Sequence, residues 1–132
     1  MHGGLPMVDG VVLDDIKKLS RECEPGEQGE KFRIYKYQQT NILGTLTDLL
    51  WADPQDNMGR GMSKRGTSMQ FGPDVTERFC KQNNIDYIIR SHEVKEKGWE
   101  RQHNGRCWTI FSGKFIQYLW CVIKMTLSAK LL

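Results

Sequence analysis

The sequence lacks several features that would mark a specialised class of protein. Its four cysteines are far apart and form no C-x-x-C pair, so we expect reduced thiols rather than structural zinc. No basic segment followed by an apolar core opens the chain, which argues against a secretory signal peptide. Lys124 and Lys130 interrupt the apolar C-terminal stretch, leaving far fewer than the roughly 20 apolar residues that span a bilayer. We therefore expect a cytoplasmic or nuclear protein without a membrane partner.

The chain also lacks a strong excess of one charge. Its 132 residues have a formal net charge of +3, with 39% hydrophobic and 27% charged residues, as in one ordinary globular domain. This small charge does not imply nucleic acid. The basic segment 60–65 has no interleaved aromatic residues on which bases would stack. We expect no nucleic-acid partner.

Periodicity and turn signals predict a mixed α/β order. Apolar residues at helical spacing predict helices over residues 12–23 and 71–84, the second beginning at Gly72 and Pro73. Residues 46–54 form a short apolar run, and residues 55–68 are predicted to be a basic, glycine-rich loop. Strands are predicted over residues 31–43 and 85–91. A hairpin is predicted over residues 99–111, turning at Asn104-Gly105.

The predicted strand 85–91 leads into a group of polar side chains. It ends on Arg90, and His92 follows two residues later. The carboxyl ends of strands in open α/β sheets often bind ligands. The alternative is that these polar residues only mark where the strand reaches solvent, since a single histidine is usually structural. His2, beside two glycines, is a second candidate ligand, and two imidazoles make half of a metal site. His103 is expected to face solvent next to the hairpin turn.

The loop at residues 59–66 has two interpretations. Arg60, Lys64 and Arg65 lie among three glycines. An arginine fork matches phosphate oxygens, and glycine allows the backbone to approach a ligand, so the loop could be a phosphate clamp. A solvated basic loop is the alternative, and the local residues leave both open.

Several motifs occur in a fixed order along residues 1–29 and about 47–112. They are HGGL, DGV-x-LDDI, DLLWADPQ, SKRG, FGPDVT, IIRSHEVK, HNGRC and TIFS. In this order they resemble the C-terminal half of the catalytic domain of the phosphoprotein phosphatase family. This family of metal-dependent serine/threonine phosphatases belongs to the metallophosphatase superfamily. The details of SKRG and FGPDVT resemble the subtype that carries tetratricopeptide repeats. The fold implied is part of a four-layer α/β sandwich, with two β-sheets flanked by helices.

The resemblance implies roles for five residues. His2 and His92 match the two histidines that ligate the second of two metal ions, which are manganese, or iron with zinc. Arg65 matches the arginine that binds the substrate phosphate. Trp51 and Asp53 match residues that border the catalytic groove. Phosphoserine and phosphothreonine proteins are the implied substrates, and no further partner is specified.

The chain also departs from the family pattern. The motifs G-D-x-H-G, G-D-x-V-D-R-G and G-N-H-E, which supply the first metal's ligands and the general acid, do not occur in the sequence. We therefore expect at most one weak metal site and no activity from the 132-residue chain alone. We expect a partial catalytic domain over residues 1–112, with an atypical insertion at about 30–45, and a non-family apolar tail at 113–132. The alternative is an inactive splice or gene-model fragment that acts at most as a phosphate-binding or interaction module.

Overall fold

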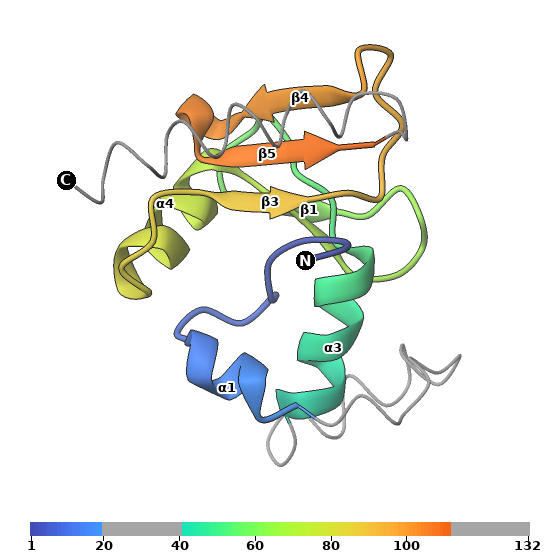
Figure 1. Ribbon diagram of the computed structural model, residues 1–132. Helices are drawn as coiled ribbons and strands as arrows, with labels where there is room; N and C mark the ends of the chain where they lie inside the picture. Colours follow the sequence, from blue (N-terminus) through green and yellow to red (C-terminus); the bar gives the residue numbers. More distant parts are fainter. Residues whose placement is uncertain (20–40, 112–132) are drawn as a thin grey trace, which may run out of the picture.

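The computed structural model of the chain describes residues 1–19 and 41–111 (Figure 1). The elements in chain order are α1 (Leu13–Lys17), α3 (Asn41–Trp51), β1 (Arg60–Met62), β2 (Met69–Phe71), α4 (Pro73–Gln82), β3 (Ile88–Arg90), β4 (Trp99–Gln102), a 3₁₀ turn η1 (His103–Gly105) and β5 (Cys107–Ile110). This order confirms the predicted mixed α/β class.

The described strands form two separate sheets. In the larger sheet β5 is central, with β3 parallel on one side and β4 antiparallel on the other. The smaller sheet is the antiparallel pair β1–β2. Between β4 and β5 the chain turns through Asn104 and Gly105, whose φ angles are 54° and 85°. Asn and Gly tolerate positive φ, which is why this pair was a hairpin signal in the sequence.

The N-terminal segment joins the larger sheet to α3. The Ser91 amide, just beyond β3, donates to the His2 carbonyl at 3.0 Å, and the Gly3 amide donates to the Leu49 carbonyl in α3 at 2.7 Å. In Figure 1 the N-terminus accordingly lies between β3 and the upper end of α3. Residues at the start of the chain are thereby fixed beside the carboxyl end of β3.

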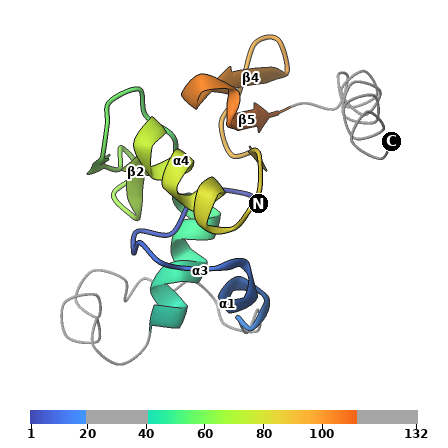
Figure 2. The ribbon, with the colours of Figure 1, turned by 90° about the vertical axis from the view of Figure 1, so that its left-hand side faces the viewer.

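Helix α4 packs its apolar side into the core. Its first residue is Pro73, preceded by the N-cap residue Gly72, and Val75 and Phe79 lie one turn apart and are both buried. Figure 2 shows α4 between β2 and the strands of the larger sheet. The core cluster comprises Leu5, Ala52, Phe71, Val75, Phe79, Cys80, Ile88 and Cys107. One apolar cluster therefore joins residues from both sheets, α4 and the N-terminal segment.

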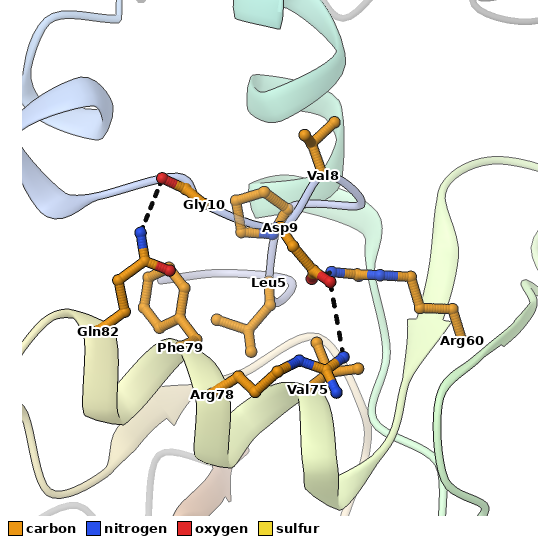
Figure 3. A pocket seen from close by; sticks show the side chains of 10 residues that line it. Leu5, Val8, Asp9, Gly10, Arg60, Val75, Arg78, Phe79 and Gln82 are labelled. Carbon is orange, nitrogen blue, oxygen red and sulfur yellow. Dashed lines mark hydrogen bonds and ion pairs between the residues drawn. The ribbon is translucent and has the colours of Figure 1, made fainter.

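A small cavity of about 60 Å³ lies between the N-terminal segment and α4 (Figure 3). Its floor is apolar, and on its rim Asp9 pairs with Arg60 at 2.8 Å and with Arg78 at 3.6 Å. The Gln82 side chain donates to the Gly10 carbonyl at 2.8 Å. These contacts attach the N-terminal segment to α4. The cavity lining includes none of the predicted site residues.

The structure corrects three details predicted from the sequence. Residues 41–43 were placed at the end of a strand but begin α3, and the predicted loop 55–68 contains the strand β1. His103 was expected to face solvent, but it is only 6% exposed. Its Nε2 atom lies 2.9 Å from the Gln55 carbonyl and its Nδ1 atom lies 2.7 Å from the Thr76 hydroxyl. These partners come from other elements, so the sequence around the turn does not reveal them.

Several predicted features lie outside the described residues. They are the predicted strand up to residue 40, most of the insertion at about 30–45, and the apolar tail at 113–132. The division of the chain at residue 112 remains a prediction. Within residues 1–19 and 41–111, no helix is both long and apolar enough to cross a membrane.

Gly4 is a position where any side chain would collide with the core. A Cβ atom there would overlap with the Phe71 ring and lie 2.9 Å from the Ala52 carbonyl oxygen. We predict that Gly4→Ala lowers the free energy of unfolding by about 1–3 kcal/mol, the usual cost of overpacking. Gly44→Ala in α3 is the control, because nothing lies within 4 Å of a Cβ there and a helical alanine should stabilise by about 0.5–1 kcal/mol. Urea denaturation measures both, and equal effects would contradict the prediction.

The buried His103 should make stability depend on pH. Burial lowers the pKa of His103, while the Gln55 carbonyl and the carboxylates of Asp56 and Asp74 partly oppose this. The unfolded chain, with a histidine pKa of about 6.5, therefore binds the proton more readily, and stability falls as pH drops below that value. We predict that His103→Gln, which keeps a donor and an acceptor, reduces the fall in unfolding free energy between pH 7.5 and 5.5. An unchanged pH profile would contradict this.

Candidate functional site

The two histidines singled out from the sequence lie together at the carboxyl end of β3. The Ser91–His2 backbone hydrogen bond brings the chain start beside the residues that follow the strand. As a result the rings of His2 and His92 have centroids 4.8 Å apart, with an angle of 36° between their planes. Residues 90 positions apart in the sequence thus present neighbouring imidazoles.

His92 has the properties of a metal ligand. Its backbone φ is +73°, an unusual value for a non-glycine residue that is typical of functional positions. Its Nδ1 atom is buried and has no hydrogen-bond partner among the described residues, and the nearest Asp53 oxygen is 3.6 Å away. Burial lowers the pKa of His92, and Arg65 lowers it further while Asp53 opposes both. A neutral imidazole with an unpaired nitrogen fits a metal ion.

The described residues supply only part of a metal site. No group of three or more histidine, cysteine, aspartate or glutamate side chains within residues 1–19 and 41–111 is arranged to hold an ion. Two imidazoles alone do not make a complete metal site, which requires further ligands.

Arg65 extends from the loop between β1 and β2 toward His92. Its backbone amide donates to the Ser63 hydroxyl at 3.1 Å, and Gly66 follows with a φ of +74°. Its Nε donates to Asp53 Oδ2 at 2.6 Å and its Nη2 donates to the His92 carbonyl at 3.3 Å. The side chain is 33% exposed, and Nη1 donates no hydrogen bond to any of the described residues. One edge of the guanidinium is held by the protein, while the other is open to an anion.

Asp53 lies beneath Arg65 and is buried. Its second oxygen, Oδ1, accepts a hydrogen bond from Arg90 Nη2 at 2.6 Å. Burial alone would raise the pKa of Asp53, but the hydrogen bonds from Arg65 and Arg90 outweigh it and hold the pKa below its usual value. The carboxylate is therefore charged and links the two arginines.

Trp51 forms one edge of the arrangement. Its ring meets the His92 ring edge-on, with centroids 5.4 Å apart and a 74° angle, and it is 38% exposed. A large aromatic surface left partly in solvent beside charged groups suits a substrate contact. All five predicted site residues thus lie in one region, although Asp53 supports Arg65 from below.

The family of the chain follows from comparisons with known proteins. A family profile for calcineurin-like phosphoesterases, a metallophosphatase family, matches residues 1–96. The chain belongs to this family. Its described sheets and helices accordingly form part of the metallophosphatase fold.

Individual relatives are similar over most of this chain. Serine/threonine-protein phosphatase 5 of Homo sapiens is 53% identical over 112 residues, which are 85% of this chain but 19% of that protein. Serine/threonine-protein phosphatase T of Aspergillus oryzae is 48% identical over 114 residues, 85% of this chain and 21% of that protein. The chain therefore spans about a fifth of the curated relatives that it matches.

A solved structure confirms the fold. It is a protein serine/threonine phosphatase from Saccharomyces cerevisiae with similarity to human phosphatase PP5. The match has a TM-score of 0.68 and 36% sequence identity, covering 87% of this chain and 31% of that chain. The resemblance read from the sequence motifs, to the phosphatase 5 type in particular, is thus confirmed.

Sequence reasoning assigned no role to Arg90, whose contacts place it at the centre of this candidate site. The signal was present, because a charged residue ended an otherwise apolar strand. Its partners were not visible, because Gly3, Ala52 and Asp53 lie 37 to 87 positions away.

The three histidines provide an internal test of metal binding. We predict that Mn²⁺ added to the chain broadens the imidazole NMR signals of His2 and His92 at low occupancy. His103 should be unaffected, because both of its ring nitrogens already have partners. Binding should be weak, because two imidazoles alone chelate poorly. Calorimetry that finds two tight sites per chain, or equal broadening of all three histidines, would contradict the assignment.

Proposed function

We propose that the protein contributes the second-metal ligands and the phosphate-binding arginine of a metal-dependent protein serine/threonine phosphatase. The convergence of His2, Arg65 and His92 carries this proposal. These residues come from the chain start, the β1–β2 loop and the end of β3, and His2 and Arg65 each contact His92. Family membership and the relatives named above support the reaction class.

The proposed substrates are phosphoserine and phosphothreonine residues of proteins. Arg65 would donate through its free edge to the phosphoryl oxygens and stabilise the negative charge that develops on them. Asp53 and the His92 carbonyl hold its other edge. The side chain is therefore already ordered before substrate binds, so binding does not cost the entropy of ordering it. Trp51 would pack against the peptide beside the phosphorylated residue.

His2 and His92 would hold the metal ion as neutral imidazoles. Bound metal supplies an activated water and polarises the phosphoryl oxygens, the chemistry that this family implies. The bonds that His2 and Arg65 make to the His92 region fix the distance between the ligands and the phosphate-binding fork. A pair of metal ions, manganese or iron with zinc, is proposed for the complete site. The remaining ligands and the general acid would come from the family motifs that this sequence does not contain.

A second candidate is a phosphate-binding module that works without metal. The open edge of Arg65 and the exposed Lys64 beside it favour this reading. Measuring phosphate affinity with and without chelator distinguishes the two candidates. Full affinity in chelator would favour the module that works without metal. For either candidate we propose a cytoplasmic or nuclear location, supported by the free buried cysteines Cys80 and Cys107.

Activity should depend on the residues assigned above. We predict that the 132-residue polypeptide does not hydrolyse a phosphoserine peptide. Once the missing motifs are restored by joining the upstream half of the domain, Arg65→Ala and His92→Ala should each lower kcat by about 10²–10³. Arg60→Ala is the matched control, since Arg60 lies near the same loop but pairs with Asp9 away from the site. A normal rate from Arg65→Ala would refute the proposed role.

A further inference from the structure

The side chain of Arg90 is fully enclosed by the protein and almost completely hydrogen-bonded. Its Nε donates to the Gly3 carbonyl at 2.6 Å, and its Nη1 donates to Glu93 Oε2 at 2.6 Å. Its Nη2 donates to the Ala52 carbonyl at 3.2 Å and to Asp53 Oδ1 at 2.6 Å. Arg90 is 1% exposed, so it contacts neither solvent nor a substrate. Four of its five N–H groups are used within the protein.

Each acceptor belongs to a segment that carries a site residue. Gly3 follows His2, Ala52 follows Trp51, and Arg90 itself lies two residues before His92. The planar fork of the guanidinium therefore sets the positions of three segments at once.

Asp53 connects Arg90 to Arg65 through its carboxylate. One oxygen of its carboxylate accepts from Arg90 and the other accepts from Arg65 Nε, both at 2.6 Å. Because both oxygens of one rigid group are engaged, the direction of the Arg90 bond fixes the direction of the Arg65 bond. The partly exposed arginine is oriented by the buried one.

We propose that Arg90 is a positioning residue, which acts through Asp53 to hold the Arg65 guanidinium beside His92 with its open edge toward an anion. The proposal rests on the function proposed for Arg65. Positive charge alone does not suffice for this role. A lysine would keep the charge, but it lacks a planar fork that reaches Gly3, Ala52 and Asp53 together.

The test uses the 132-residue chain, inorganic phosphate and NMR signals of arginine Nε–H groups, in chelator. In the wild-type chain the Arg65 Nε–H should exchange slowly with water, because Asp53 accepts it. In Arg90→Lys we expect this exchange to be about tenfold faster and phosphate binding to be about tenfold weaker, as for the loss of a charge-assisted hydrogen bond. A folded Arg90→Lys chain with unchanged exchange and affinity would overturn the proposal, because a purely structural role would change only stability.

Two further variants isolate the cause. Arg78→Lys is the matched control. Arg78 lies on α4 and pairs with Asp9 and Asp74, so this substitution should leave both the exchange rate and the phosphate affinity unchanged. Arg65→Ala tests the proposed function separately. If it leaves phosphate affinity intact, the phosphate role of Arg65 fails. The Arg65 exchange rate in Arg90→Lys still decides whether Arg90 positions it.

If Arg90→Lys does not fold, the proposal can still be tested with Arg90 in place, by measuring the exchange of arginine Nε–H groups in the wild-type chain and in Asp53→Asn. In the wild-type chain the Arg90 Nε–H should exchange far more slowly than that of the exposed Arg78. Phosphate should shift the Arg65 signal and not the Arg90 signal. In Asp53→Asn the exchange of Arg65 should accelerate while Arg90, with its other acceptors, stays protected. Rapid exchange of Arg90, or a phosphate-induced shift as large as that of Arg65, would overturn the proposal.

Discussion

The Arg90 guanidinium, buried between the larger sheet, the chain start and the end of α3, faces two carboxylates and two backbone carbonyls. A buried cation is tolerated only when its N–H groups are paired, and removing one partner typically costs about 3–5 kcal/mol. The Gly3, Ala52 and Asp53 segments must therefore approach Arg90 together. The positions of His2, Trp51 and Arg65 follow from this requirement.

Acidic and basic side chains alternate along the ion pairs that extend from Arg90 toward the surface. Asp53 lies between Arg90 and Arg65, and on the other side Glu93 contacts Arg90 at 2.6 Å and Lys95 at 3.8 Å. Lys95 also pairs with Glu100 on β4. Asp53 thus has an arginine on each side, and these two arginines keep it ionised despite its burial. The exposed end of the series contributes little, since solvent screens such pairs.

The same packing explains why the glycines of the HGG motif are needed. A Cβ atom on Gly3 would collide with the backbone at Leu50, and one on Gly4 would collide with the Phe71 ring. Only bare backbone fits between α3 and the core at this depth. His2 can then lie beside His92, whose own positive φ turns its ring back toward the chain start. The pairing of these two imidazoles is thus a consequence of close backbone packing.

Local signals in the sequence determined α4 and the hairpin, because Pro73, the spacing of Val75 and Phe79, and Asn104-Gly105 act within one turn of the chain. The motifs also identified the family, and the structure brings together the five residues that the motifs predicted for the site. The tertiary structure alone decided the burial of His103, the strand β1 and the role of Asp53 under Arg65. It also decided the partners of Arg90, up to 87 positions away. Hydrogen bonds across such separations leave no periodic pattern in the sequence, because they depend on which segments the folded core brings into contact.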